Sequence, residues 1–426
     1  MTPIVRPPPV ADVVAQHVEE AAHLRHVRSV QVRAAHVRLR HLGRLDERIA
    51  AHLEGVAVAG DYGSAQALRH LERPGVGEMF VAAVRAIEDR DARRLDRLIA
   101  LAEALPDRRA GLLSAFGWVS AGRLSGITKR LLESASSWWR EVGIATCAMH
   151  GVDPERKLTE FINAAEASLR ARSLRTAGCL GRIDLIESCR AALGDPDRRC
   201  TFEAARSALL LGDRGVSTQA LNGLVADAEA YPGMREAALL ALARVSPPAE
   251  MRSLLASLAK VPALRRTLVR ALAIVGDPHY LPWLITQMDD LNLTRLVGGA
   301  FSLITGVDLA YSPLERKPPS GTDFGPTDDA QDVSVAMDED DGLPWPEPAE
   351  ISAWWHSNSL RFAVGVRHFM GQPPSPSHCL HVLRNGFQPQ RAVAAHHLCL
   401  LNPGTPLFNV CAPARRQSRQ LEAMTA

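Results

Sequence analysis

The sequence predicts an all-α fold in which helix pairs stack into an α-solenoid. Of the 426 residues, 46% are hydrophobic and only 5% are aromatic, and Ala, Leu, Val and Arg dominate. This composition favours helices that pack closely through small side chains. Turn-like breaks recur about every thirty residues, with two apolar-periodic segments between them. Because a lone helix pair cannot bury both of its apolar faces, stacked pairs that share a continuous core are expected.

The N-terminal region is expected to be a flexible segment, residues 1–10, followed by a helical cap, residues 11–59. One face of the cap carries a periodic apolar stripe, which would cover the end of the array. The stripe consists of Leu42, Leu45, Ile49 and Leu53. Six histidines occur here, and His23 and His26 lie one turn apart. No carboxylate or Cys recurs at a matching spacing, so solvated histidines are favoured over a metal site or a pH sensor.

Residues 60–311 are predicted to hold the repeats. The breaks are Gly60-Asp61, Arg90-Asp91, Gly122, Asp153-Pro154, Gly181-Arg182, Gly212-Asp213, Pro247-Pro248, Asp277-Pro278 and Gly306. Asp277 can accept hydrogen bonds from the first amides of the next helix, and Pro278 suits the first helical position because it needs no N–H there. Asp153-Pro154 and Asp195-Pro196 are expected to act in the same way. The pattern predicts about eight helix pairs.

The C-terminal third begins with a change of composition. Residues 312–348 are rich in Pro, Gly and acids, and the stretch from Pro313 to Glu350 has eleven acids against two bases. We expect a flexible acidic linker, with an intramolecular role against the basic helices as the alternative. A calcium loop starting at Asp338 is rejected because Leu343 and Ala349 stand where Gly and Glu are required. Residues 349–412 are predicted to form a C-terminal helical cap, and residues 413–426 a flexible tail.

The candidate binding residues are Trp138, Trp139 and Arg140. Together with Glu141 they resemble part of the equipment of HEAT-like DNA glycosylases, which combine a basic surface with tryptophans and an acid. Core and rim packing is the simpler interpretation of the paired tryptophans. Lysines are few, and phosphate contacts would depend on Arg, so binding to nucleic acid is the weaker alternative.

The sequence offers no catalytic, cofactor or metal residues. No GxxxxGK, GxSxG or HExxH motif occurs, and no histidine is followed by Glu, as HEAT-like di-iron hydroxylases require. The seven cysteines never form CxxC, which favours a reducing compartment. Two clusters could together bind zinc, and they are His378-Cys379 with His381 and His396-His397 with Cys399. Cysteines that pack inward explain these clusters more simply than a zinc site does. No run approaches a membrane span, so a cytoplasmic protein is expected.

The repeats resemble the HEAT-repeat superfamily, with a Gly-Asp-Pro turn, an apolar first helix and a second helix in which Arg precedes Ala and Leu. The likeness spans roughly residues 60–306 and is best over Gly276 to Gly306. Such motifs specify fold far better than function.

A narrower resemblance covers nearly the whole chain. The stretches LDERIAAHLEGVAVAG (45–60), LPWPEPAEISAWW (343–355) and PGTPLFNVCAPARRQ (403–417) are similar to those of an uncharacterised bacterial HEAT-like family often encoded near type VI secretion genes. This resemblance implies an accessory, adaptor or chaperone-like role for a secretion effector or spike protein, and it supplies no catalytic residues. With the solenoid pattern and the missing enzyme motifs, the sequence predicts a non-enzymatic protein-binding scaffold; nucleic-acid binding is the second alternative and a HEAT-like enzyme the third.

Overall fold

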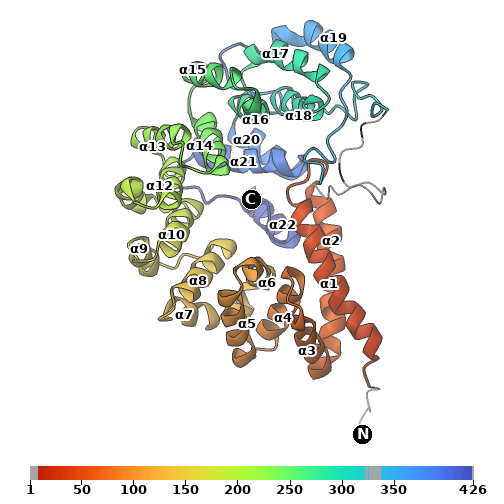
Figure 1. Cartoon of the computed structure of the whole chain (residues 1–426), viewed down its shortest axis with the longest axis vertical. Helices are drawn as coiled ribbons and strands as arrows, with labels where there is room; N and C mark the ends of the chain where they lie inside the picture. Colours follow the sequence, from red (N-terminus) through yellow and green to blue (C-terminus); the bar gives the residue numbers. More distant parts are fainter. Residues whose placement is uncertain (1–7, 321, 323–324, 326–336, 425–426) are drawn as a thin grey trace. The chain divides into compact units, whose positions relative to one another are not determined.

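The computed structural model describes residues 8–320, 322, 325 and 337–424, and the regular elements of that part of the chain are helices (Figure 1). Two isolated β-bridges pair Glu315 with Pro346 and Phe369 with Gln372. The all-α prediction is confirmed. The chain divides into two compact units. Unit 1 comprises Met1–Arg33, Val37–Leu180 and Asn409–Ala426, and unit 2 comprises Ala34–His36 and Gly181–Phe408.

Unit 1 contains the first ten α-helices and the last one. They are α1 (Ala11–Gln31), α2 (Leu39–Val58), α3 (Gly60–Arg69), α4 (Val76–Glu88), α5 (Ala92–Ala104), α6 (Arg109–Trp118), α7 (Ile127–Leu132), α8 (Ser137–His150), α9 (Arg156–Ile162), α10 (Ala167–Leu180) and α22 (Ala414–Ala423). Its 3₁₀ turns are η1 (His70–Glu72), η2 (Pro106–Arg108) and η3 (Ala121–Leu124).

Unit 2 contains the remaining α-helices. They are α11 (Ile186–Ala191), α12 (Arg198–Leu210), α13 (Val216–Ala226), α14 (Pro232–Val245), α15 (Pro248–Ala259), α16 (Arg265–Val275), α17 (Leu281–Thr286), α18 (Thr294–Thr305), α19 (Pro348–Asn358), α20 (Pro376–Asn385) and α21 (Gln388–Leu401). Its 3₁₀ turns are η4 (Ile183–Leu185), η5 (Ala192–Gly194), η6 (Pro262–Leu264), η7 (Pro278–Tyr280), η8 (Gln287–Asp289) and η9 (Ser359–Arg361).

Successive helices pack as pairs, and the second helices of neighbouring pairs pack on each other. In unit 1, α4, α6, α8 and α10 form one such succession, and in unit 2, α12, α14, α16 and α18 form another. The inner position of α4 explains its sequence, since every residue from Met79 to Ile87 is buried. In α2, the predicted apolar stripe of Leu42, Leu45, Ile49 and Leu53 is buried too. Burial of these faces supplies most of the stability of short helices.

Arginines join the two helices of a pair. Four arginines near the start of a second helix donate hydrogen bonds to carbonyls at or just beyond the end of the first helix. They are Arg109 to Ala102 and Glu103, Arg140 to Ser134, Arg170 to Ala164 and Ala165, and Arg235 to Val225. The last carbonyls of a helix lack intrahelical donors, so a guanidinium satisfies them and also complements the negative end of the helix dipole.

The Gly276-Asp277-Pro278 sequence separates two helix pairs, as predicted. Gly276 ends α16 with φ +69°, and a Cβ at this position would lie 2.3 Å from the His368 carbonyl oxygen. Asp277 Oδ1 accepts a hydrogen bond from the His279 amide at 3.0 Å, and Pro278 begins η7. The segment therefore serves as a turn and a cap.

The other two Asp-Pro pairs behave differently from the prediction. Asp153 accepts a hydrogen bond from the Glu155 amide at 2.8 Å, and Asp195 accepts one from the Asp197 amide at 2.9 Å. These bonds form tight turns before the helices and do not cap them. Asp197 is the residue that caps α12, through the amides of its first turn. α9 begins at Arg156 and α12 at Arg198, so one further residue separates each of these prolines from its helix, whereas Pro278 begins η7 directly.

The chain after α19 runs along helix ends in unit 2. The sequence predicted instead that residues 349–412 form a helical cap on the end of the array. Arg367 donates hydrogen bonds to the carbonyls of Ala243, Arg244 and Ser246 at the end of α14, and to Val275 at the end of α16. The next residues bond through their main chain. His368 donates to Gly276, Met370 to Leu303 and Gly371 to Ile304. This part of the C-terminal region therefore completes the helix ends of α14, α16 and α18.

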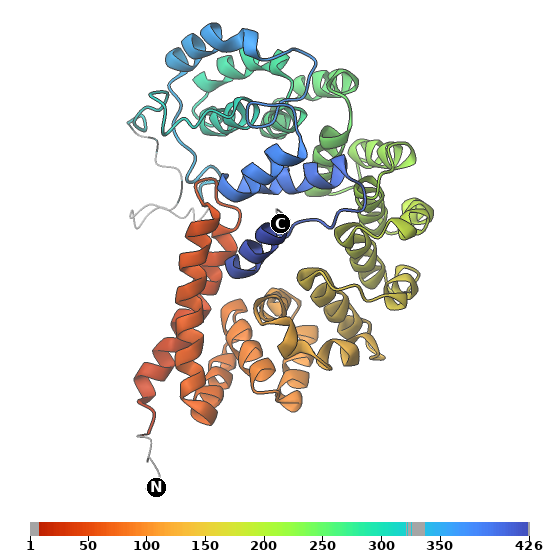
Figure 2. The same cartoon turned by 180° about the vertical axis from the view of Figure 1, so that it is seen from behind.

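The predicted flexible tail, residues 413–426, is a helix over residues 414–423. This helix, α22, packs against α2 in unit 1, and the two lie together in both views (Figures 1 and 2). The Asp46 carboxylate accepts a hydrogen bond from the Ala414 amide at 2.6 Å, and Arg28 donates to the carbonyls of Cys411 and Ala412 at 3.0 Å. Arg-rich composition suggested a solvated tail, but Leu421 and Gln417 are buried against the unit.

The predicted acidic linker, residues 312–348, is packed at both of its described ends. Arg316 donates its amide hydrogen to Trp345, and Glu347 donates to Leu314, each at 2.8 Å. Asp338, Glu339 and Asp340 form ion pairs with arginines of α16 and α18. These contacts agree with the alternative of an intramolecular role. Residues 321, 323–324 and 326–336 of the linker lie outside the described part of the chain, as do residues 1–7.

Candidate functional site

The two predicted tryptophans lie at the start of α8, where Trp138 is buried in the core of unit 1 and Trp139 is partly buried against the same core. Ser136 caps the helix, and its Oγ accepts a hydrogen bond from the Trp139 amide at 3.4 Å. The Trp138 indole points into unit 1, is 7% exposed and donates from Nε1 to the Ile99 carbonyl at 3.1 Å. The guanidinium of Arg109 lies over its ring at 4.3 Å. Trp138 is therefore a core residue that a partner cannot reach.

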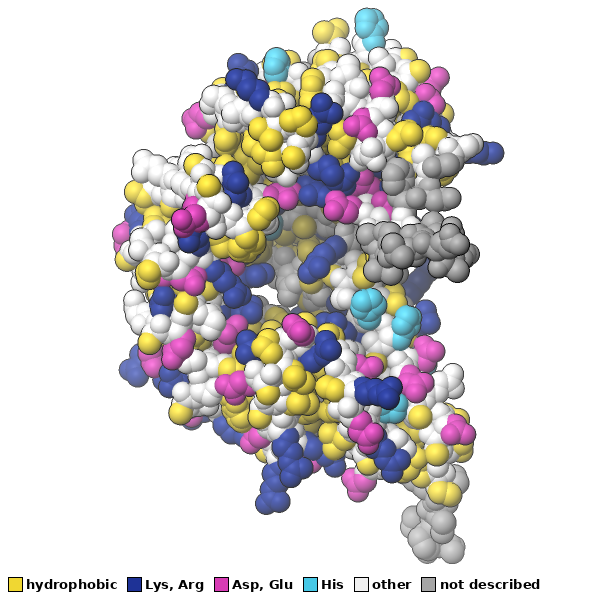
Figure 3. Space-filling view, in the orientation of Figure 1, with side chains coloured by type: hydrophobic (Ala, Val, Ile, Leu, Met, Phe, Trp, Pro, Cys, Tyr) yellow, Lys and Arg dark blue, Asp and Glu magenta, His cyan; other side chains and the backbone are white. Residues whose placement is uncertain are grey.

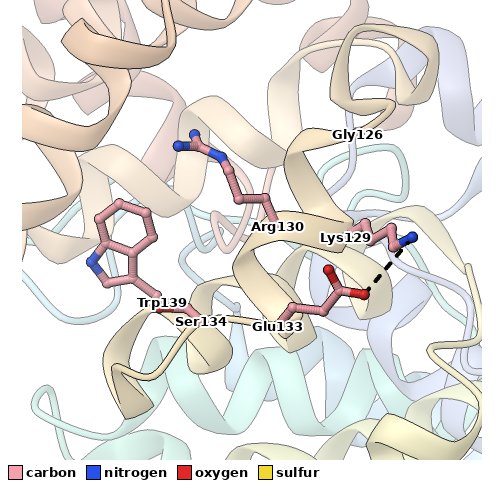
Figure 4. Close-up of a pocket in the computed structure, with 6 residues that line it drawn as sticks. All are labelled: Gly126, Lys129, Arg130, Glu133, Ser134 and Trp139. Carbon is pink, nitrogen blue, oxygen red and sulfur yellow. Dashed lines mark ion pairs between the residues drawn. The ribbon is translucent and has the colours of Figure 1, made fainter.

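Trp139 lines a shallow pocket of about 360 Å³ (Figure 4). The other walls come from α7 and the turns beside it. They are Gly126, Lys129, Arg130, Glu133 and Ser134. The pocket is open to solvent, and its floor combines an aromatic ring with both signs of charge. Such a surface can hold a flat or apolar group against the indole and orient it with charged hydrogen bonds.

The charges of this pocket are partly neutralised by neighbours. The Arg130 guanidinium bonds to the Asp96 carboxylate at 2.7 Å and lies 5.8 Å from the Trp139 ring centre. Lys129 Nζ is 3.9 Å from Glu133 Oε1, and both side chains are exposed. Exposed pairs of this kind exchange partners at little cost. Lys129 and Arg130 are thus available to a ligand that brings its own acceptors.

Arg140, the third predicted binding residue, turns toward α7 and α9. Its Nε donates to the Ser134 carbonyl at 2.6 Å, and its guanidinium lies 5.5 Å from the centre of the Phe161 ring. The structure therefore separates the three predicted residues and brings Trp139 together with Lys129 and Arg130, which sequence reasoning did not select. The sequence offered only the four-residue spacing of Lys129 and Glu133, which is typical of an ion pair along one helix face.

A second pocket of about 200 Å³ adjoins the first at Gly126 and contains Cys147 and His150. Burial, reinforced by the charge of Asp153, raises the pKa of the Cys147 thiol to about 11. Burial also lowers the pKa of His150, whose Nε2 donates to the Phe116 carbonyl at 2.8 Å. A nucleophilic cysteine needs a stabilised thiolate, whereas the raised pKa keeps the Cys147 thiol protonated. Cys147 and His150 are therefore structural residues.

Among the described residues, no group of three or more His, Cys, Asp or Glu side chains could hold a metal ion. In the C-terminal clusters, His378 Nε2 donates to the Phe369 carbonyl at 2.9 Å, and Cys379 and Cys399 are buried. In the N-terminal cap, His17 and His52 place their Nδ1 atoms 3.0 Å apart, so these two rings bond to each other.

Comparison of the chain with protein-family models, with curated proteins and with solved structures found no match. The HEAT-repeat resemblance and the narrower bacterial resemblance therefore remain expectations from the sequence. None of the described helices combines the length and the apolar character that crossing a bilayer requires.

Proposed function

We propose that this chain is a non-enzymatic protein-binding scaffold, and that it holds a partner protein at the pocket beside Trp139. Its architecture under this proposal is a HEAT-like α-solenoid of about eight helix pairs with helical caps. The resemblance of residues 45–60, 343–355 and 403–417 extends the proposal to a bacterial cytoplasmic accessory, adaptor or chaperone-like factor for a type VI secretion effector or spike protein.

The arginine bonds between paired helices support the solenoid. Arg109, Arg140 and Arg170 follow one another at intervals of about thirty residues and make the same kind of contact, as repeated structural units do. The second helices pack in sequence within each unit, which is how stacked pairs bury their shared faces. Arg235 repeats the contact in unit 2.

The observation that carries the binding proposal is the setting of Trp139. Its indole is partly buried against the core of unit 1 and also lines an open pocket, whereas the adjacent Trp138 is buried and bonded to the Ile99 carbonyl. Tryptophan and arginine supply a large share of the energy of protein interfaces, because each offers a wide contact area with polar ends. On the face shown in Figure 3, basic and acidic side chains are interspersed with apolar ones, a mixture that suits a protein partner.

The test is a pair of variants in the full chain. A partner recovered by affinity purification from the native cells is itself purified and titrated against wild type and Trp139→Ala/Arg130→Ala. We expect affinity to fall at least about tenfold with only mild dependence on salt. Trp283→Ala, at a partly buried tryptophan of α17, is the matched control and should bind as wild type. Equal affinity of wild type and the double variant would contradict the proposal.

Nucleic-acid binding is the second candidate, because Lys129 and Arg130 line the same pocket as the Trp139 indole. A stacked base with phosphate contacts would release counterions, so its affinity would fall steeply with salt. We expect no submicromolar binding of random single-stranded or duplex DNA at physiological salt in fluorescence anisotropy. A steep salt slope that Trp139→Ala abolishes would favour nucleic acid. Trp138→Ala is unsuitable for this test because it would disturb the core.

A further inference from the structure

A second basic surface lies in unit 2 and is already occupied by the chain itself. Arg266 and Arg270 stand one turn apart on α16, and Arg295 stands on α18; we call these three the arginine row. The acidic run Asp338–Asp341 lies on this row. None of these residues belongs to the pocket beside Trp139, which is in unit 1.

Three successive carboxylates of the run meet the row. Asp340 receives two hydrogen bonds from Arg266, at 2.5 and 3.0 Å. Glu339 Oε2 lies 3.1 Å from Arg266 Nε and 3.3 Å from Arg270 Nη2. Asp338 pairs with Arg295 at 2.6 Å. Two-pronged contacts between a guanidinium and a carboxylate are the strongest and most directional of such pairs.

The acidic run forms a turn that lets the side chains of Asp338, Glu339 and Asp340 reach the row. Asp338 Oδ1 accepts a hydrogen bond from the Asp340 amide at 3.0 Å, and the Asp338 carbonyl accepts one from the Asp341 amide at 3.3 Å. Arg295 also donates to the Asp340 carbonyl at 3.3 Å. The row therefore recognises a peptide, through its main chain as well as its carboxylates.

The row has a fixed end and an exchangeable end. Arg295 is 9% exposed, and its guanidinium lies 4.9 Å from the Trp345 ring centre. This buried arginine anchors Asp338. Arg266 and Arg270 are 29% and 36% exposed, and Glu339 is 68% exposed, so the pairs of Glu339 are held weakly. The Asp340 carboxylate is only 8% exposed and belongs to the fixed part of the contact.

Both exposed arginines keep an acidic partner when Glu339 leaves. Arg266 remains paired with Asp340 at 2.5 Å, and Arg270 remains paired with Glu236 at 2.9 Å. Departure of Glu339 therefore leaves neither guanidinium without a carboxylate, so the exchange avoids the cost of an uncompensated charge.

We propose that the arginine row is a docking site for an acidic peptide segment of a partner protein, and that Asp338–Asp341 is its resident occupant. A carboxylate of the partner segment displaces Glu339 from Arg266 and Arg270, while Asp338 stays on Arg295 and Asp340 stays on Arg266. The run thus limits access to the row to segments that compete with Glu339 in charge.

The experiment removes the charges that the run places on Arg266 and Arg270 and offers the run back as a free peptide; we call the variants that lack them emptied. The probe is a fluorescein-labelled peptide with the sequence of residues 337–343, MDEDDGL, and its control carries Asn and Gln in place of Asp and Glu. We expect Glu339→Gln/Asp340→Asn to bind the probe about tenfold more tightly than wild type, with marked salt dependence. Adding Arg266→Ala/Arg270→Ala should abolish this binding, and the control peptide should not bind.

Two further variants keep the result interpretable. Arg198→Ala removes an exposed arginine of unit 2 that also pairs with two acids, Asp227 and Glu229, and should leave binding by the emptied protein unchanged. Glu339→Gln alone alters only an exposed side chain and should raise affinity about threefold even if the double variant does not fold.

Three outcomes would overturn the proposal. The first is equal binding of the probe by wild type and both emptied variants. The second is binding that survives the loss of Arg266 and Arg270. The third is displacement of the probe by single-stranded DNA of equal charge at a lower concentration than unlabelled peptide requires.

Discussion

Arg367 in unit 2 and Arg416 in unit 1 perform the same task to different extents. Each lies in the C-terminal part of the chain and donates to carbonyls at the ends of two earlier helices. Arg416 reaches Met149 in α8 at 3.2 Å and Val119 after α6 at 3.1 Å. Arg367 reaches four carbonyls, and main-chain bonds from the residues that follow it continue the contact.

The two arginines differ in what else anchors the segments that carry them. Burial lowers the pKa of Arg367 to about 10, and that of Arg416 also to about 10, so both guanidinium groups are charged at neutral pH. Unit 1 has a further anchor for its segment in the packed helix α22, which Arg28 and Asp46 hold. In unit 2 the extended segment around Arg367 depends on hydrogen bonds to helix ends. The comparison teaches that helix ends in unit 2 depend more heavily on one side chain.

The largest expected effect is that of Arg367→Met. The substitution leaves buried carbonyls of α14 and α16 without donors, and each such loss is costly, so the free energy of unfolding of unit 2 should fall by about 3–5 kcal/mol. Hydrogen exchange of the full chain measures this directly. Amides of α14 and α16 should lose protection, while those of α6 and α8 should keep it. Uniform loss across both units would break the comparison.

Acid should affect unit 2 next most strongly. Burial, with the charges of Arg367 and Arg244 nearby, lowers the pKa of His397 to about 3 from 6.5. The unfolded chain therefore takes up a proton first as pH falls. The stability is complete above pH 6.5 and is lost progressively down to about pH 3.

At pH 5 the loss from His397 should be about 2 kcal/mol. Urea unfolding at pH 7 and pH 5 measures it. The His397→Gln variant should show a smaller difference between the two pH values than wild type. An unchanged difference would show that other groups carry the acid sensitivity.

Arg416→Met should have the smallest effect of the three. Two carbonyls lose a donor, but α22 remains packed on α2, so we expect about 1 kcal/mol. Protection of the last turns of α6 and α8 against hydrogen exchange should fall slightly. A loss as large as that of Arg367→Met would mean that the two arginines are equivalent and that α22 contributes little.

Local sequence predicted the helices well, because apolar periodicity and caps are encoded within a few residues of each other. Gly276-Asp277-Pro278 is an example, since its turn depends on its own residues. The packing of residues 362–372 was not predictable in this way. Arg367 bonds to carbonyls that lie 92 to 124 residues earlier, and every residue has a carbonyl, so the acceptors have no sequence signal.

Only part of the candidate site could be predicted from the sequence, and the reason is similar. The sequence indicated that Trp138 and Trp139 begin a helix, but adjacent helical residues point about 100° apart, so only one could face the pocket. Which one faces inward depends on the position of Ile99, in another helix. In the acidic linker, charge indicated attraction to basic helices without indicating that Arg266, Arg270 and Arg295 are the ones engaged.

The hydrogen bonds of Arg367 also impose an order on folding during synthesis. The ribosome releases α14 and α16 long before residue 367, because the bonded carbonyls precede it by 92 to 124 residues. Until then the ends of these helices are satisfied by water, and the growing chain holds unit 2 in an unfinished form. Translation that stops before Arg367 would release a chain with open helix ends, which is a substrate for proteases and chaperones.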